Sequence, residues 1–322
     1  MLEISLNTLL LVVGLGLLII SSDWLIQGAV KVSFLAKLTP LFVGAVIVAF
    51  GTSAPEAGVS IVAAVRNYKD IALGNIVGSN IANIGLILGL CAILRPLNVS
   101  KRIFKKELPI MLLAMALLYF LSFDLIISRQ DGLILILAFI IFCFISYRSA
   151  KELFDEQEIR GFEFNKVMKN FNSPFRVSLI ILLSLLGVII GADLMVRGGA
   201  NLAKTFGISP WIIGITIFAI GTSLPELAAS LTAAFKNVHS ISVGNIVGSN
   251  IFNVLFVLGI ASLVRPIALE ASILRFELPV MLIFSAVLFI VMRTKYKITR
   301  WEGLTMLLGY VCFIYFLIIR HS

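Results

Sequence analysis

Two glutamates lie in the middle of strongly apolar segments of this chain. Glu56 closes the motif GTSAPE, and Glu226 closes the motif GTSLPE in the second half of the chain. Because an ionisable side chain in such a segment is costly, it marks a functional site. Thr52 and Ser53 precede Glu56 by four and three residues, so their hydroxyl groups share its face in a helix, and the second copy repeats this spacing.

A proline precedes each glutamate and weakens the helix before it. Pro55 and Pro225 have no backbone N–H, so the carbonyl groups of Gly51 and Gly221 lose their helical hydrogen-bond partners. A carbonyl group freed in this way can bind a cation where it faces a cavity. The motifs therefore predict interrupted helices that offer carboxylate, hydroxyl and carbonyl oxygens.

A second repeated motif adds amide groups to this set. GNIVGSNIAN at 74–83 recurs as GNIVGSNIFN at 244–253, with nine of ten residues identical. In each copy the serine and the last asparagine are four residues apart and share a helical face. The combined oxygen ligands, without His, Cys or Met, suit Ca²⁺ or Na⁺ and are poor for zinc or copper. Two carboxylates in a low-dielectric site repel each other, so we expect protons to compete with the metal.

The composition indicates that a membrane surrounds the elements that carry these residues. Of 322 residues, 60% are hydrophobic and 13% charged, and the mean hydropathy is +1.07. A soluble domain has about 25% charged residues, which argues against a soluble enzyme, a disordered protein or a secreted domain. Cys91, Cys143 and Cys312 lie in apolar runs without CxxC spacing and predict neither disulfides nor a zinc site.

Apolar runs bounded by charged residues, Pro or Gly predict ten spans. Each span needs about 20 mostly apolar residues. With the N-terminus outside, the inside loops would carry 18 Lys and Arg and the outside segments 8. This bias predicts that both termini are outside and that the middle of the chain is cytoplasmic. The predicted spans are 6–26, 40–65, 71–94, 107–123, 132–147, 175–196, 210–235, 241–264, 277–292 and 301–319.

Glu226 follows Glu56 by 170 residues. The same offset of 170 residues relates positions far outside the motifs, for example Asp23 and Asp193. Each half holds five predicted spans, so the second half must enter the membrane from the opposite side. Inverted repeats of this kind are typical of secondary transporters, which place their site between the halves. We therefore predict an all-α membrane protein with ten transmembrane helices as two inverted-topology five-helix repeats, 1–147 and 175–322, joined by a cytoplasmic linker, 148–174.

Other repeated polar residues are predicted to have structural roles. Asn80 and Asn250 are expected to form hydrogen bonds between helices. Asp23 and Asp193 are expected near span ends, with a helix-end or gating contact rather than ion coordination as their role.

The paired motifs resemble the two alpha-repeats of the cation/Ca²⁺ exchanger superfamily, particularly the prokaryotic Na⁺/Ca²⁺ exchangers, over nearly the whole chain. The resemblance implies an antiporter that exports Ca²⁺ in exchange for several Na⁺ by alternating access, in which helices 1 and 6 slide against the core. It implies ion ligands in both repeats, with the alanines acting through their backbone carbonyl groups: Ala49, Thr52, Ser53, Glu56, Ser79, Asn83, Ala219, Thr222, Ser223, Glu226, Ser249 and Asn253.

Two departures from relatives refine this expectation. Some relatives, including the potassium-dependent branch, have an aspartate where this chain has Asn253, which argues against potassium coupling. Animal exchangers carry large calcium-sensing domains between the halves, and the linker at 148–174 is too short for one.

Alternatives remain open from the sequence. A Ca²⁺/H⁺ antiporter on the same fold is the nearest, because the glutamate pair is expected to bind protons. A channel fits less well, since a site with two lone carboxylates suits occluded exchange. An enzyme is disfavoured because no HExxH or Ser–His pairing occurs.

The expected partners are Ca²⁺, Na⁺ and membrane lipid, without a cofactor or nucleic acid. The expected location is the cytoplasmic membrane, and the expected state is a monomer. The formal net charge of +9 is interpreted as an orientation signal.

Overall fold

The described chain is almost entirely helical, with short helices in series where the apolar segments are interrupted. The first part of the predicted span at 40–65 and nearly all of the linker lie outside the described residues. The computed structural model describes residues 2–35, 49–151, 173–235, 239–294 and 296–321.

The elements follow one another in an order that repeats in the second half of the chain. The helices are α1 (Leu2–Leu35), α3 (Ala49–Thr52), α4 (Ala54–Val65), α5 (Lys69–Ala82), α6 (Gly89–Leu94), α7 (Leu108–Leu121), α8 (Arg129–Lys151), α11 (Pro174–Phe206), α12 (Pro210–Ile213), α13 (Ala219–Thr222), α14 (Leu224–Phe235), α15 (His239–Phe252), α16 (Leu258–Val264), α17 (Ala271–Arg275), α18 (Glu277–Arg293) and α19 (Arg300–His321). Four π-helical segments of the described residues continue them: η2 (Asn83–Leu88), η3 (Ile103–Glu107), η4 (Gly214–Phe218) and η5 (Asn253–Val257).

Eight helical stretches of the described residues are long and apolar enough to cross a membrane. They coincide with eight of the predicted spans. Of the other two, the span at 40–65 is described only from Ala49 onward, as α3 and α4, and the span at 107–123 contains the 14-residue helix α7. The count of ten therefore stays a prediction.

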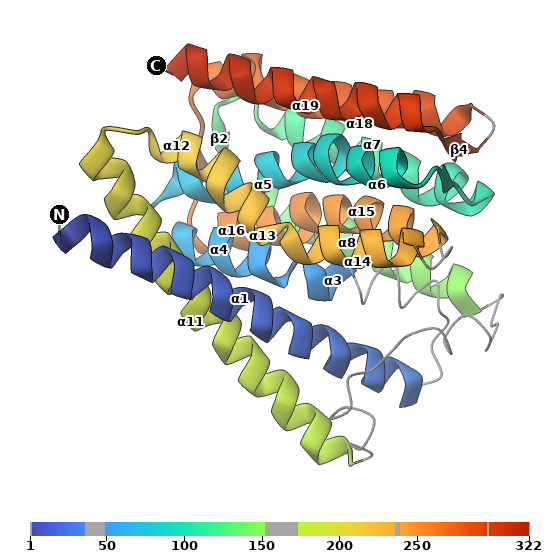
Figure 1. Cartoon of the computed structure of the whole chain (residues 1–322), viewed down its shortest axis with the longest axis horizontal. Helices are drawn as coiled ribbons and strands as arrows, with labels where there is room; N and C mark the ends of the chain where they lie inside the picture. Colours follow the sequence, from blue (N-terminus) through green and yellow to red (C-terminus); the bar gives the residue numbers. More distant parts are fainter. Residues whose placement is uncertain (1, 36–48, 152–172, 236–238, 295, 322) are drawn as a thin grey trace.

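The two longest helices form a pair along one side of the molecule (Figure 1). α1 has 34 residues and α11 has 33, so each is about 50 Å long at 1.5 Å per residue. This exceeds the hydrocarbon thickness of about 30 Å, so each must tilt or project from the bilayer. Glycines permit their contact, since a Cβ atom on Gly14 would lie 2.7 Å from the carbonyl oxygen of Gly191.

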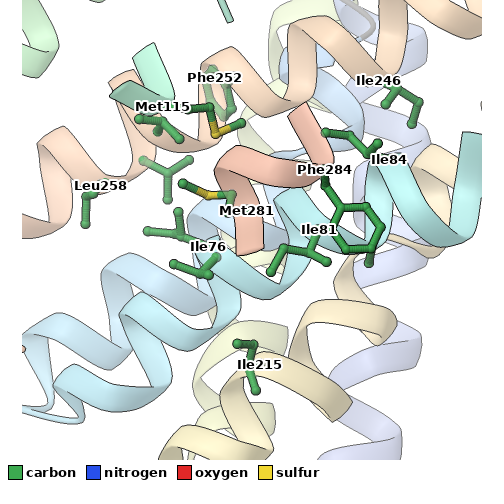
Figure 2. Packing of buried hydrophobic residues seen from close by; sticks show 14 of the residues in the cluster. Ile76, Ile81, Ile84, Met115, Ile215, Ile246, Phe252, Leu258, Met281 and Phe284 are labelled. Carbon is green, nitrogen blue, oxygen red and sulfur yellow. The ribbon is translucent and has the colours of Figure 1, made fainter. Parts of the chain in front are cut away.

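The centre of the molecule is built from α5 and α15 with their π-helical continuations. The spans that contain them are 83% buried, whereas the other six candidate spans are between 22% and 50% buried. Figure 2 shows Ile76 and Ile81 of α5 packed among buried residues that include Met115 of α7 and Met281 and Phe284 of α18. The two copies of the second motif therefore lie on the most enclosed helices.

Within the described residues, two short antiparallel ribbons connect the halves. β1 (Leu97–Asn98) pairs with β4 (Lys297–Ile298), and β2 (Ile126–Ile127) pairs with β3 (Ile267–Ala268). Each ribbon takes one strand from each half of the chain. The offset that relates the repeated motifs also relates β1 to β3, and β2 and β4 lie within one residue of it.

Candidate functional site

Both glutamate-centred helices break at the serine of the motif, two residues before the proline. α3 ends before Ser53 and α4 begins after it, and Ser223 separates α13 from α14 in the same way. Proline disfavours helical geometry in the residues before it and is well tolerated in a first helical turn. Glu56 and Glu226 consequently lie in the first turns of α4 and α14, where free N–H groups favour a carboxylate.

All twelve sequence-predicted ligands are buried, and none of their side chains is more than 2% exposed. Glu56 and Glu226 are both 0% exposed, and none of the ion pairs formed by the described residues includes either. Buried charges are stable only when they are compensated by partners or bound ions. These two carboxylates therefore require a compensating cation or protons.

Each carboxylate is bound by a serine of the opposite repeat. The Ser53 hydroxyl donates to Glu226 Oε1 at 2.8 Å, and the Ser223 hydroxyl donates to Glu56 Oε1 at 2.9 Å. Ser249 adds a third hydroxyl, which donates to Glu226 Oε1 at 3.3 Å. The Oε2 atoms of both glutamates are buried and have no hydrogen-bond partner among the described residues. Two carboxylate oxygens are thus available to a hard cation at the junction of the repeats.

The threonines of the motif reach asparagines that the sequence analysis missed. Thr52 Oγ1 donates to Asn245 Oδ1 at 3.2 Å and lies 3.5 Å from the Ser249 hydroxyl, and Thr222 Oγ1 donates to Asn75 Oδ1 at 3.1 Å. Asn75 and Asn245 follow the first glycine of the second motif in each copy. Their repetition at the same offset was the signal that could have identified them.

The carbonyl oxygens of Ala49 and Ala219 lie within the same network. Ala49 O accepts from the Ser53 backbone N–H at 3.0 Å, and Ala219 O accepts from that of Ser223 at 3.2 Å. The Ser79 hydroxyl also donates to Ala219 O, at 3.4 Å. Because a carbonyl oxygen has two lone pairs, a backbone hydrogen bond does not exhaust its capacity as an acceptor.

The amide groups on α5, η2, α15 and η5 are arranged differently in the two repeats. Asn83 Nδ2 donates to Asn250 Oδ1 at 2.9 Å, and Asn250 Nδ2 donates to the backbone oxygen of Asn80 at 3.2 Å. The side chain of Asn80 donates within its own helix, to Ile76 O at 2.7 Å. Neither amide atom of Asn253 has a hydrogen-bond partner among the described residues. The predicted bond between helices is confirmed for the side chain of Asn250 and is wrong for that of Asn80.

The two predicted aspartates lie inside α1 and α11 rather than at helix ends. Asp193 is paired with Arg66, at the end of α4, and with Arg197 of its own helix at 2.8 Å. Asp193 therefore connects α11 to α4, the helix that carries Glu56. Asp23 accepts a hydrogen bond from Gln27 at 2.7 Å.

Comparison with known proteins agrees with this arrangement. The family model described as "Sodium/calcium exchanger protein" matches residues 6–148 and 177–319. The chain is 32% identical to the "Sodium/calcium exchanger MaX1" of Methanosarcina acetivorans, over 97% of this chain and 98% of the relative. It is 34% identical to the "Inner membrane protein YrbG" of Escherichia coli, over 88% of this chain and 87% of the relative.

Solved structures of the sodium-calcium exchanger NCX_Mj have the same fold. A structure soaked with 2.5 mM Na⁺ and 0.1 mM Ca²⁺ matches with a TM-score of 0.68 and 32% identity, over 96% of this chain and 98% of that one. A structure soaked with zero Na⁺ and Ca²⁺ gives a TM-score of 0.67 at 32% identity, over 98% and 99% of the two chains. Motifs, fold and relatives agree, and this multi-pass membrane protein belongs to the sodium/calcium exchanger protein family.

Proposed function

We propose that this chain is a secondary active antiporter that exports Ca²⁺ across the cytoplasmic membrane in exchange for entering Na⁺. The observation that carries the proposal is the pair of fully buried carboxylates, Glu56 and Glu226, each held by a serine of the other repeat and each with one unpartnered oxygen. Their two negative charges balance one Ca²⁺ or two of several Na⁺. The names of MaX1 and NCX_Mj support the same pair of ions.

The ligands that we propose combine carboxylate, hydroxyl, amide and backbone carbonyl oxygens, a set that hard cations prefer. The described network brings most of these groups together through hydrogen bonds between the repeats. The proposed ligands are Glu56, Glu226, Thr52, Thr222, Ser53, Ser223, Ala49, Ala219, Ser79, Ser249, Asn83 and Asn253.

The same charge pair explains why transport would be an exchange. Without a cation, two carboxylates would face each other in a site that excludes water, and this state is costly. A carrier that must neutralise the pair before it rearranges cannot return without cargo. Because Na⁺ and Ca²⁺ would use the same oxygens, release of one ion on either side requires binding of the other.

We propose that the architecture consists of ten membrane helices in two inverted repeats, 1–147 and 175–322, with a cytoplasmic linker at 148–174 and both termini outside. Three observations support it: the matching helix breaks at Ser53 and Ser223, the two related ribbons, and the reciprocal serine–glutamate bonds. The two chain ends also lie toward one side of the molecule, whereas α8 ends and α11 begins at the other (Figure 1). The site lies within one chain, which supports a monomer that works in membrane lipid.

Flux into proteoliposomes tests the proposed function. Vesicles loaded with Na⁺ and diluted into Na⁺-free buffer should take up calcium-45, whereas vesicles loaded with choline should not. A pH gradient of either sign, imposed without Na⁺, should drive little uptake. Uptake that follows the pH gradient and ignores Na⁺ would replace this proposal with a Ca²⁺/H⁺ antiporter. Conductance of single-channel size in planar bilayers would replace it with a channel.

A further inference from the structure

Two buried asparagines outside the proposed ligand set connect the repeats crosswise. Asn75 accepts the hydroxyl of Thr222 at 3.1 Å, and Asn245 accepts the hydroxyl of Thr52 at 3.2 Å. Both asparagines are 0% exposed. Each bond runs from the motif of one repeat to the motif of the other, so each threonine is held by the opposite half of the molecule.

The orientation of the first amide is fixed by its own repeat. Asn75 Nδ2 donates to the Ser60 hydroxyl at 2.9 Å and to the backbone oxygen of Glu56 at 3.3 Å. Both acceptors lie on α4, and Ser60 follows Glu56 by one helical turn. Because the nitrogen is engaged there, the amide oxygen must face Thr222.

The second amide is fixed in a similar way. Asn245 Nδ2 donates to the Ser230 hydroxyl at 3.2 Å, and Ser230 in turn donates to the backbone oxygen of Ser242 at 3.4 Å. Ser230 stands at the same offset from Ser60 as the other repeated residues. The arrangement of serine, asparagine and opposite threonine therefore occurs twice, which a chance contact would not produce.

A hydroxyl group that binds a cation must direct a lone pair at the ion and its proton elsewhere. A hydrogen-bond acceptor on the side of the hydroxyl group away from the cation holds the proton in that direction. Each threonine also has an acceptor on its own helix: Phe218 O at 2.8 Å from Thr222, and Ala49 O at 3.3 Å from Thr52. For Thr222 the bond within the helix is the shorter one, whereas for Thr52 the bond to Asn245 is the shorter one.

We propose that Asn75 and Asn245 are positioning residues of the cation site. Each accepts the hydroxyl proton of the threonine in the opposite repeat and thereby presents the threonine oxygen to the transported cation. Their action through Thr222 and Thr52 makes the affinity of each half of the site depend on the other half. The inference rests on the proposed function, because it requires that the threonines bind the cation.

Crosswise double-mutant cycles on Ca²⁺ affinity test the inference. The readout is the half-saturating Ca²⁺ concentration for Na⁺-dependent calcium-45 uptake by the full chain in proteoliposomes. Changing a residue that orients a metal ligand typically costs 10–100-fold in affinity, so Asn245→Ala should raise this concentration by about tenfold. In a Thr52→Val background it should have little further effect, and in a Thr222→Val background it should have its full effect.

Asn75→Ala should show the mirror pattern, coupled to Thr222 and independent of Thr52. Its effect should be the smaller of the two, because Thr222 retains the shorter bond within its own helix. A merely structural role would lower the melting temperature of the detergent-solubilised protein and would add equally to both threonine changes. If Asn245→Ala does not fold, Asn245→Ser, which keeps a short polar side chain, takes its place in the cycle.

The experiment distinguishes failure of this inference from failure of the proposed function. Unchanged Ca²⁺ affinity in both asparagine variants, or equal coupling of each asparagine to both threonines, would overturn the inference while wild-type exchange stands. Absence of Na⁺-dependent Ca²⁺ uptake by the wild type would overturn the proposed function and the inference with it.

Discussion

The candidate site has two layers of side chains, a carboxylate layer and an amide layer. The repeated sequence predicts that both layers are equally symmetric, but the amide layer is much less symmetric than the carboxylate layer. In the carboxylate layer, Ser53 binds Glu226 at 2.8 Å and Ser223 binds Glu56 at 2.9 Å, so these reciprocal bonds are nearly equal, although Ser249 adds a weaker bond to Glu226 at 3.3 Å. In the amide layer, Asn83 is held by Asn250, whereas the side chain of its counterpart, Asn253, has no hydrogen-bond partner among the described residues.

The difference shows what a repeated motif determines. The reciprocal serine–glutamate bonds need only the residues of the GTSAPE and GTSLPE motifs, and these two motifs form matching bonds. The amide layer also depends on its neighbours, and these differ between the copies. Ala82 precedes Asn83, but Phe252 precedes Asn253 and lies in an aromatic cluster, 4.8 Å from Phe256 and 4.9 Å from Phe50 between ring centroids.

Removing either charge of the carboxylate layer should have the largest effect. Glu56→Gln and Glu226→Gln should each abolish Na⁺-driven Ca²⁺ uptake, because one carboxylate cannot balance a divalent ion in a buried site. Leaving a buried charge without its compensating opposite charge costs about 3–5 kcal/mol, and for the bound cation this is a reduction in affinity of roughly 100-fold or more. The measurement is calcium-45 flux, with Glu3→Gln on the exposed start of α1 as the matched control. Near-wild-type flux in either variant would contradict the role of the pair.

Removing the reciprocal hydroxyl groups should test the symmetry of the same layer. Ser53→Ala and Ser223→Ala should each raise the half-saturating Ca²⁺ concentration by about tenfold, since hydrogen bonds to charged groups contribute about 1.5–3 kcal/mol. The effect of Ser53→Ala should be the smaller of the two, because Ser249 still donates to Glu226 after Ser53 is removed. A large effect in one and none in the other would show that the layer functions asymmetrically.

The amide layer should respond unequally. Asn83→Ala should weaken Ca²⁺ binding more than Asn253→Ala, because Asn250 holds the Asn83 amide in place and a preorganised ligand loses less entropy on binding. Isothermal titration with Ca²⁺ on the purified protein would measure both affinities. Equal losses would show that the difference between the two amides does not affect binding.

The ion pair between Arg66 and Asp193 lies outside both layers and should give the smallest effect. Both side chains are partly exposed, and exposed pairs contribute about 0–1 kcal/mol. Arg66→Gln should therefore lower the melting temperature only slightly and leave Ca²⁺ affinity unchanged. Arg129→Gln, at the exposed start of α8, is the control. A Ca²⁺ affinity reduced as much as in the serine variants would place this contact within the binding machinery.

Sequence reasoning predicted that the two glutamates are buried and that the helices beside them are weakened, because both properties depend on local chemistry. The prolines predicted a loss of helical hydrogen bonds at Gly51 and Gly221, and the helices break two residues later, at Ser53 and Ser223. The apolar surroundings predicted that both glutamates would be buried. The helix lengths were predicted less well. The spans predicted at 6–26 and 175–196 end near the aspartates, but α1 and α11 continue to Leu35 and Phe206, because a charged residue does not end backbone hydrogen bonding.

The contacts between repeats could not be predicted, since spacing along a helix does not say which side chain faces it from another helix. The sequence shows Asn75 and Asn245 only as members of the second motif and does not indicate their hydrogen-bond partners. Their bonds to Thr222 and Thr52 arise from the packing of α5 and α15 against the first motif of the opposite repeat. Asn80 illustrates the converse error. An acceptor in its own helix, at Ile76, was available to its side chain, and the sequence pattern does not distinguish that bond from one between helices.

The two ribbons have a consequence for how the protein is made. Because β1 and β2 precede α11 in the chain and pair with β4 and β3 beyond it, a ribosome delivers the first two strands long before their partners exist. Neither half can complete a ribbon alone, and the nascent first half must stay in the membrane with these strand edges unpaired. The ribbon of β2 and β3 therefore cannot close before residue 268 is made, and the ribbon of β1 and β4 cannot close before residue 298 is made.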